Sequence, residues 1–332
     1  MLRTSHVGSF PLDYSRENVE KITRDLYNIG LDVPPYPQMR SFIDIYLKPL
    51  ADSGILTRHR DYYIINIDLD ELDNVSLPKP SIPEAEIMVN FIRSRNIKFS
   101  GLRAPITGVF TLASKIYVSN KYIPDLKSTL LPRLEQVSDF LVKYLTLFID
   151  YLVGLGFNII FIDEPILGVI VGRKRILFGI REELIIDLFE KLLGKYNVDK
   201  GIHVCGRISS KLFEILTMIE ELDYLNFEFH DTPQNIDTIN PILLEKYDKF
   251  LAPGVVSSKK PVVEEVDEIL DILYRLYHKI GSRIDLVSGD CGFAGLKGTL
   301  PDPDKLYNIT ISKLRNIVIA VNRFKNDLKT RV

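Results

Sequence analysis

The sequence predicts an α/β protein that folds as a single (β/α)8 TIM barrel, with a small hairpin and helical insertion near the N-terminus. From about residue 84 onward, helix-like and strand-like segments alternate, which indicates parallel strands connected by helices. Together with the strands expected earlier, this rhythm gives about eight units. The chain has 332 residues, 46% of them hydrophobic, which suffices for one large core. No repeat or low-complexity linker divides residues 1–332, so one catalytic domain is expected.

The N-terminal part contains the irregular segments. Proline excludes a helix from 33–38, where a strand near 31–37 is expected. The β-branched, alternating run at 61–67 is typical of a hairpin strand, within an insertion at about 51–83 that ends in a Pro-rich connection at 77–83. The other elements expected here are an opening strand that runs from Arg3 into a Gly-Ser turn, a helix at 15–30 and a helix at 41–50.

The rest of the chain is regular. Its most apolar helix, at about 140–155, is interrupted by Lys143 and Asp150, so it is expected to be buried rather than to span a membrane. In chain order, the expected elements are helix 84–95, strand 97–106, helices within 120–155, strand 157–165, helix 181–195, strand 200–205, helix 208–221, strand 224–230, strand 249–256, helix 262–280, strand 284–290 and helix 303–326.

Charge and targeting signals narrow the function classes. The net charge of -2, with acidic and basic residues mixed, argues against nucleic acid or a membrane surface as the main partner. The first residues lack the apolar core of a signal peptide, so a cytoplasmic location is expected.

Three strand-like runs end in residues that can bind a metal. The first ends at His203-Val204-Cys205, and because alternate residues of a strand point to the same side, its imidazole and thiol are expected to face one space. Cys291 ends the second run, and Glu228 lies among aromatic residues in the third, where an unpaired charge would be costly. A tetrahedral zinc ion bound by all four side chains would explain their placement.

Simpler interpretations exist for each residue alone. A lone cysteine is most often a small buried apolar residue, and a strand histidine is most often part of the core. A disulfide between Cys205 and Cys291 is another alternative, which the absence of a secretory signal does not favour. The joint pattern favours a metal, because the carboxyl ends of barrel strands converge where active sites of this fold lie.

Two further motifs fall at predicted strand ends. The turn at Gly8-Ser9 has backbone amides that could hold a carboxylate, although a plain strand-to-loop turn is a common explanation of Gly-Ser. A fully apolar strand ends at Asp163-Glu164-Pro165, where one carboxylate could cap the next segment or pair with a neighbouring strand. Beside a metal at the rim of a barrel, Asp163 would suit a substrate amino group.

In chain order, these motifs resemble those of the catalytic barrel of the cobalamin-independent methionine synthases. The resemblance spans nearly the whole chain, and the family's zinc-bearing carboxyl-terminal barrel stands alone here, as in short archaeal members. The motifs are Val7-Gly8-Ser9-Phe10-Pro11, Asp163-Glu164-Pro165, His203-Val204-Cys205, Glu228, Pro253-Gly254-Val255 and Asp290-Cys291-Gly292.

The resemblance implies a function and a set of residue roles. The implied reaction is methylation of the thiol of L-homocysteine to give L-methionine, and the implied zinc ligands are the four residues named above. The substrate carboxylate would be held by the backbone of Val7 to Ser9 and by the Ser9 hydroxyl, and its ammonium group by Asp163. Gln38 falls about where the family has a glutamate that contacts the amino acid.

The sequence departs from the family at residues linked to the methyl donor. Lys115 replaces a tryptophan that stacks on folate, and Val169 replaces an acid that contacts folate, which together would weaken folate binding by several kcal/mol. Lys259 replaces the proton-donating histidine, and it either assists proton transfer or is simply solvated. A methyl-corrinoid carried on a partner protein, or a methyl donor delivered by a separate donor-binding subunit, is therefore expected in place of a polyglutamylated folate.

Two other functions remain compatible with the sequence. One is a zinc-dependent alkyl transfer to a different thiol, such as a small sulfonate, which would need no partner for an amino group. The other is a non-catalytic subunit that zinc only stabilises, although structural zinc sites usually consist of four cysteine or histidine ligands.

Overall fold

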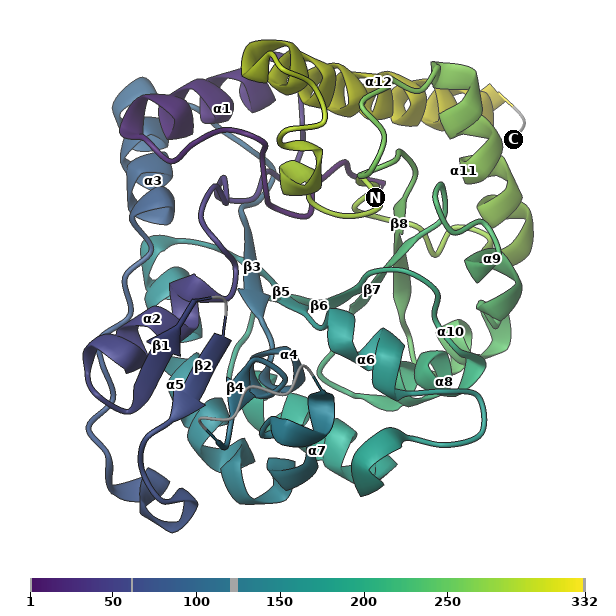
Figure 1. Ribbon diagram of the computed structural model, residues 1–332. Coiled ribbons are helices and arrows are strands. Elements are labelled where there is room, and N and C mark those ends of the chain that lie inside the picture. Colours follow the sequence, from purple (N-terminus) through teal and green to yellow (C-terminus); the bar gives the residue numbers. More distant parts are fainter. Residues whose placement is uncertain (1, 61, 120–124, 331–332) are drawn as a thin grey trace.

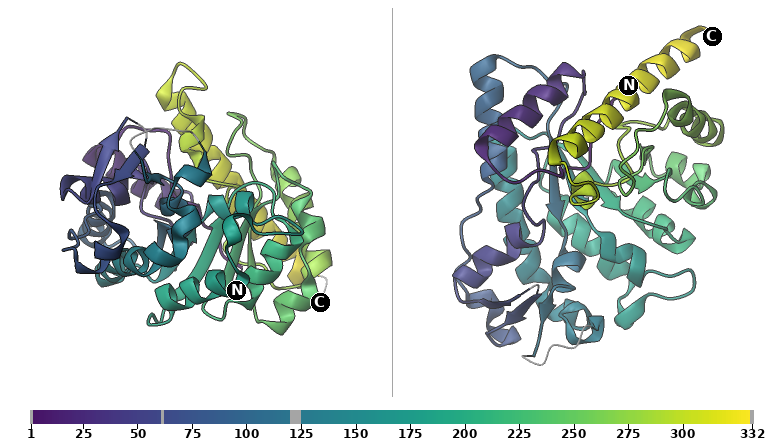
Figure 2. Two further views of the ribbon diagram at one scale, coloured as in Figure 1. Left: turned by 60° about the horizontal axis from the view of Figure 1, so that its bottom comes forward. Right: turned by 45° about the horizontal axis from the view of Figure 1, so that its top comes forward.

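The computed structural model describes residues 2–60, 62–119 and 125–330, and its helices surround a ring of strands (Figures 1 and 2). Five of the strands form a continuous parallel sheet. In spatial order they are β3 (Arg103–Thr107), β5 (Ile159–Asp163), β6 (Asp199–Val204), β7 (Tyr224–Glu228) and β8 (Phe250–Gly254).

Single parallel bridges continue this sheet around the ring. Segments near residues 4, 33 and 287 run between β8 and β3 as extended chain, and each pairs with its neighbours. The bridges are Leu251 with Ile284, Gly254 with Ser288, Val287 with Thr4, Ser5 with Val33, and Pro35 with Arg103. Eight parallel segments therefore follow one another around the ring, and the predicted (β/α)8 barrel is confirmed.

Helices cover the outside of the ring because each has one apolar face. In α11 (Val266–Ile280) the face that contains Ile269, Leu273 and Leu276 is buried, and a capping box at Glu265 begins the helix. The other long helices are α1 (Arg16–Asn28), α3 (Pro83–Arg95), α5 (Leu134–Leu155), α7 (Glu182–Leu193), α8 (Ser210–Met218) and α12 (Pro303–Thr330). Among the described residues, no helix is both long and apolar enough to cross a membrane.

A small sheet stands beside the barrel, in the region where the sequence predicts an insertion. Strands β1 (Leu56–His59) and β2 (Tyr62–Ile65) form an antiparallel hairpin, and β2 pairs in parallel with β4 (Ile116–Tyr117) (Figure 1). The predicted run at 61–67 is therefore a hairpin strand, except that Asp61 lies outside the described residues. Helix α2 (Asp44–Asp52) precedes the hairpin, about three residues later than the predicted helix at 41–50.

Several predicted elements need correction. The strand predicted at 31–37 forms only single bridges, and the helix predicted at 262–280 begins at Val266. The strand predicted at 97–106 begins only at Arg103, because Asn96 in a left-handed conformation ends α3 and residues 97–102 connect the two elements. The strand predicted at 284–290 forms only single bridges, because Leu286 has a positive φ of 51° that interrupts a regular ladder. Helix α5 begins at Leu134, after two 3-10 turns within 126–133, and residues 120–124 lie outside the described part.

Short helices follow several strands directly, and the sequence did not predict them. Two of them, α4 (Val109–Ala113) and α6 (Pro165–Ile170), follow β3 and β5, and α9 (Asn235–Thr238) and α10 (Pro241–Lys246) follow β7. Each has six residues or fewer, which is too short for a helical period to stand out.

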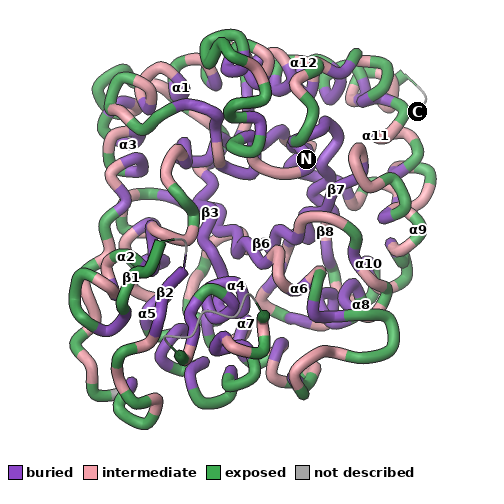
Figure 3. The backbone as a smooth tube through the Cα atoms, viewed as in Figure 1, coloured by how far each residue is buried: buried purple, intermediate pink, exposed green. Residues whose placement is uncertain are grey.

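The interior of the barrel is apolar at one end and polar at the other. A separate apolar cluster fills the ring near the amino ends of the strands, and the ring itself is buried almost throughout (Figure 3). Its members are Val33, Ile159, Phe161, Tyr224, Ala252 and Leu286. At the carboxyl ends, buried polar side chains take over, among them Asp163, His203 and Glu228. This polar end is where a barrel of this kind has its active site.

Candidate metal centre

One imidazole and two thiols meet at the carboxyl ends of the strands. The Nε2 atom of His203 lies 2.9 Å from the Sγ of Cys205, which lies 2.9 Å from the Sγ of Cys291. One donor atom from each of these residues lies within 4.8 Å of the others. Both cysteines are free thiols, so the structure does not contain the alternative disulfide. His203 is buried and the two cysteines are half-buried, as a centre reached from the rim requires.

The thiols share hydrogen bonds that favour one thiolate. The pKa of Cys291 lies well below its usual value because Cys205 is hydrogen-bonded to it and His203 is nearby, and these effects outweigh burial. The same hydrogen bond holds the pKa of Cys205 well above its usual value. A thiolate stabilised by a thiol and an imidazole is a group that readily binds a soft or borderline cation.

The folding of the neighbouring loops brings Cys291 to this place. The carboxylate of Asp290 accepts hydrogen bonds from the backbone amides of Phe229, His230 and Asp231, at 3.0, 3.1 and 2.5 Å. This contact ties the loop after the last barrel segment to the loop after β7. The two residues of the Asp-Cys motif therefore have different roles. Asp290 fixes the loop, and Cys291 provides the thiol.

Glu228 ends β7 beside the cluster but is not part of it. Its carboxylate is almost fully buried, and Oε2 accepts hydrogen bonds from the Thr232 hydroxyl at 2.9 Å and from Nζ of Lys259 at 3.4 Å. The group of donors within 4.8 Å of one another contains the other three predicted ligands but not Glu228. The structure thus brings three of the four predicted ligands together and leaves the fourth paired with a lysine.

The predicted carboxylate-binding loop lies next to the same centre. The Ser9 carbonyl accepts a hydrogen bond from the Phe293 amide at 2.8 Å, and the Ser9 hydroxyl accepts one from Ala294 at 3.0 Å, so the loop adjoins the segment that carries Cys291. Gln38 is buried on the other side of this loop, where its backbone amide donates to the Gly8 carbonyl at 3.0 Å. Val7, which precedes these residues, is also buried.

Asp163 and Glu164 are neighbours in sequence but face different surroundings. Oδ1 of Asp163 is buried and has no hydrogen-bond partner among the described residues. Burial raises the pKa of Asp163 to about 7, against the opposing effects of His203 and Arg103. Asp163 is adjacent to His203 in the register of β5 and β6, so its free oxygen lies at the level of the His203, Cys205 and Cys291 cluster. A buried carboxylate oxygen without a partner is a candidate contact for a cationic ligand group.

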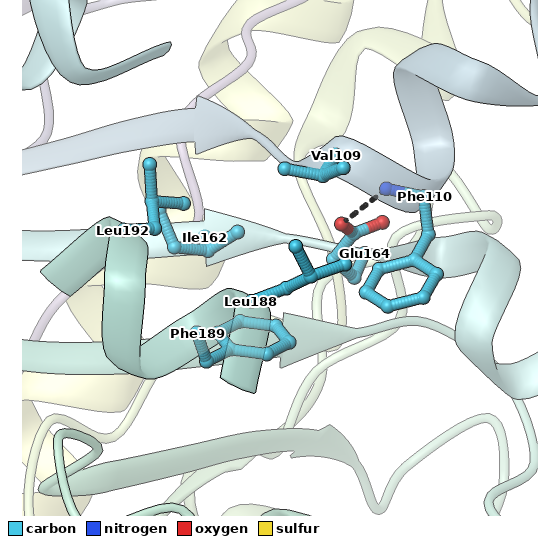
Figure 4. A pocket seen from close by; sticks show the side chains of 7 residues that line it. All are labelled: Val109, Phe110, Ile162, Glu164, Leu188, Phe189 and Leu192. Atoms are coloured by element: carbon cyan, nitrogen blue, oxygen red, sulfur yellow. Dashed lines mark hydrogen bonds between the residues drawn. The ribbon is translucent and has the colours of Figure 1, made fainter. Parts of the chain in front are cut away.

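Glu164 instead holds the start of helix α4. Its two oxygens accept hydrogen bonds from the Phe110 amide at 2.9 Å and from the Thr111 amide and hydroxyl at 2.8 and 2.6 Å. Figure 4 shows this carboxylate between α4 and Leu188 and Phe189 of α7. Burial raises the pKa of Glu164 to about 8. The sequence allowed either carboxylate to cap a neighbouring segment. In the structure, Glu164 has this role at the start of α4.

The residues at the predicted donor positions lie at the rim. Lys259 is 63% exposed and pairs with Glu228, which raises the lysine pKa despite partial burial. Val169 on α6 is 62% exposed. Lys115 is exposed and lines a pocket of about 320 Å³ together with Ser41, Phe42, Ile43, Asp44 and Arg58.

Sequence reasoning missed Arg103, which lies inside the barrel below the cluster. Its side chain is fully buried, and Nη2 donates a hydrogen bond to Oδ1 of Asn226 at 3.2 Å. The signal is that Arg103 is the charged residue in an otherwise uncharged run at 100–107.

A family model, curated relatives and solved structures that resemble this chain point to the same family. The family model described as the catalytic domain of cobalamin-independent synthase matches residues 145–321. A methionine synthase from Methanothermobacter marburgensis is 26% identical over 329 residues, which cover 97% of this chain and 93% of that protein. A methionine synthase from Sulfolobus acidocaldarius is 24% identical over 94% of this chain and 83% of that protein. A solved B12-independent methionine synthase from Shewanella covers 99% of both chains with a TM-score of 0.71, at 15% identity, which establishes similarity of fold.

Proposed function

Because this chain belongs to the family of cobalamin-independent synthase catalytic domains, we propose that it is a zinc-dependent methyltransferase that converts L-homocysteine to L-methionine. The relatives that match nearly the whole chain are named methionine synthase, and this supports a transferase. The observation that carries the proposal is the meeting of His203, Cys205 and Cys291 within 4.8 Å at the carboxyl ends of the strands.

The donor set fits zinc. One imidazole nitrogen and two thiols are ligands that Zn²⁺ prefers, and Glu228, buried beside them, would supply the fourth. A carboxylate that also pairs with Lys259 is a ligand that an incoming thiol could replace. When bound, zinc would keep the substrate sulfur in its nucleophilic thiolate form at neutral pH.

We assign the charged ends of homocysteine to two sides of the centre. The backbone of Val7, Gly8 and Ser9 and the Ser9 hydroxyl would hold the carboxylate, and Gln38 would line the same side. The free oxygen of Asp163 would accept the ammonium group. Clamping both ends would orient the sulfur towards the thiols of Cys205 and Cys291 and would select an amino acid over a simple thiol.

The methyl donor would approach from the rim. Lys259 stands there beside Glu228, and we propose it as a proton donor only for a methyl donor that leaves as a basic nitrogen, because a corrinoid that gives up its methyl group leaves as cobalt(I) and takes no proton. Exposed Lys115 and Val169 offer neither a stacking ring nor an acid for a folate. We therefore propose a methyl-corrinoid as donor, delivered by a corrinoid protein or by a separate donor-binding subunit.

We further propose that residues 1–332 act as one catalytic domain. The ring of strands draws on both ends of the chain, since the segment near residue 4 pairs with the segment near residue 287. The hairpin within 51–83 would be an insertion beside the barrel, because it pairs with β4 rather than with the ring.

A donor assay tests the proposal. Zinc-loaded protein and L-homocysteine are incubated with methylcobalamin in one reaction and with a methylated folate in another, and methionine is measured. We expect methionine from methylcobalamin, with much slower or no turnover from folate. Turnover with folate alone would contradict the proposed donor, and absence of methionine from both donors and from a reconstituted corrinoid protein would contradict the methyltransferase itself.

A further inference from the structure

Arg103 crosses the interior of the barrel directly below the metal cluster. Its guanidinium carbon lies 3.7 Å from the centre of the Phe161 ring on β5, and its Nη2 reaches Asn226 on β7. Phe161 lies two residues before Asp163 on the same face of β5, and Asn226 is the register partner of His203. The Arg103 guanidinium therefore places a positive charge one layer of side chains beneath the site, and we call this group the cationic floor.

The structure makes room for this floor. Gly201 of β6 faces the Phe161 ring, and a Cβ atom at this glycine would collide with it. The ring can then lie flat against the guanidinium, an arrangement in which a cation is attracted to the aromatic face. The stacked pair is thus supported by a glycine on the neighbouring strand.

A cation in this position is costly. Nε and Nη1 of Arg103 have no hydrogen-bond partner among the described residues, and the residue is fully buried. An apolar side chain of similar size would usually be more stable in such a place. Burial lowers the pKa of Arg103 to about 10, which still leaves it charged at neutral pH. A buried cation with one hydrogen bond needs opposite charge nearby.

The opposite charge lies in the proposed site. The negative charges of Asp163 and Cys291 both stabilise the charged form of Arg103 and raise its pKa. Nearby His6 is neutral, because burial lowers its pKa to about 3. If the proposed zinc ion is present, the charges of zinc, Lys259 and Arg103 balance those of two thiolates, Glu228 and Asp163. Without Arg103 the centre would carry one excess negative charge before any substrate arrives.

We propose that Arg103 is a positioning residue that keeps the centre neutral before substrate arrives, so that the homocysteine sulfur can join it as a third thiolate without meeting an excess negative charge. This inference rests on the proposed function. Its consequence is discrimination between substrate and product, because the sulfur of homocysteine is anionic when bound, whereas that of methionine is neutral. The cationic floor stabilises the anionic sulfur of homocysteine and has little effect on the neutral sulfur of methionine. The product would therefore dissociate more easily than the substrate.

The test compares three affinities in zinc-loaded R103M and R103Q with those of the original protein. R103M removes the charge with little change in volume, and R103Q keeps a donor for Asn226. We expect homocysteine binding, measured by calorimetry, to weaken about tenfold or more, as for loss of one unit charge within several ångströms. L-methionine should bind almost as before, because it adds no net charge to the site. Zinc affinity, measured by competition with a chelator, should not fall, because the loss of a nearby positive charge does not oppose the binding of a divalent cation.

Two controls separate charge from structure. R103K restores the cation and should recover most of the homocysteine affinity. R283M removes an arginine that also lies over a phenylalanine ring, that of Phe250, but at the amino ends of the strands, and should leave all three affinities unchanged. Its partner Asp248 is 86% exposed, so no buried charge is stranded.

Several outcomes would overturn the inference. An equal loss of homocysteine and methionine affinity would mean that Arg103 only supports the shape of the site, and so would a loss of zinc from both neutral variants. Unchanged homocysteine affinity in either folded neutral variant would exclude the charge role. The proposed function fails separately, if the original protein binds neither zinc nor homocysteine.

Discussion

Two adjacent carboxylates illustrate how position decides the role of a residue. Glu164 is satisfied by three hydrogen bonds at the start of α4, whereas Oδ1 of Asp163 has none among the described residues. Both are buried, so the difference lies in their partners. The sequence predicts that one of these carboxylates contacts substrate and allows one to cap a neighbouring segment. Only the contacts in the structure assign the cap to Glu164 and the free oxygen to Asp163.

The isosteric substitution Asp163→Asn tests the ammonium contact. We expect the KM for homocysteine to rise about tenfold or more, the usual effect of losing a hydrogen bond between charged groups. Zinc content, measured by elemental analysis, should not change. Affinity for 4-mercaptobutyrate, which lacks the amino group, should be the same in both proteins. Equal KM values for homocysteine would favour transfer to a different thiol.

At the scale of elements, the sequence predicts strand ends better than strand geometry. His203, Cys205 and Cys291 could be predicted to converge, because each follows an apolar run and the carboxyl ends of barrel strands share one rim. The pairing of Glu228 with Lys259 could not be predicted, because it joins two side chains that lie 31 residues apart in the sequence. The inward direction of Arg103 is not apparent from the sequence, because a charged side chain is rarely buried inside a barrel.

Helix α4 depends on close contact between two loops. Gly108 precedes it, and a Cβ atom there would collide with the carboxylate of Glu164. Gly108→Ala should therefore destabilise the protein by about 1–3 kcal/mol, the range for overpacked interiors, although its φ of -84° suits alanine.

Gly154→Ala is the matched control for this substitution. Gly154 lies in α5, and a Cβ atom there would meet nothing within 4 Å. Alanine should be neutral or should stabilise by up to about 1 kcal/mol, because it favours the helix. Urea unfolding compares both variants with the original protein, and equal midpoints for the two would contradict the proposed collision.

At the scale of the whole molecule, the two ends of the chain close the barrel. Arg3 donates from Nε and Nη2 to the Asp285 carboxylate at 3.0 and 2.7 Å, and its backbone amide donates to the same group at 2.6 Å. These contacts join the first and last barrel segments at the end opposite the proposed site. Closure thus depends on residues nearly 300 positions apart, and no local pattern in the sequence indicates this pairing.

Arg3→Met should weaken this closure. Asp285 would stay buried without its main charged partner, so the free energy of unfolding should fall by about 2 kcal/mol. Arg323→Met removes an exposed arginine that pairs with Asp267 and should cost no more than about 0.5 kcal/mol. Similar urea midpoints for the two variants would mean that the barrel does not depend on this contact.

The coordination of zinc before and after homocysteine addition is the most direct test of the central claim. X-ray absorption at the zinc edge counts sulfur neighbours. The protein alone should give sulfur from Cys205 and Cys291, with the remaining positions filled by nitrogen and oxygen. Homocysteine should add one sulfur neighbour and remove one oxygen. An unchanged sulfur count with saturating homocysteine, or a zinc ion without sulfur neighbours, would contradict the account.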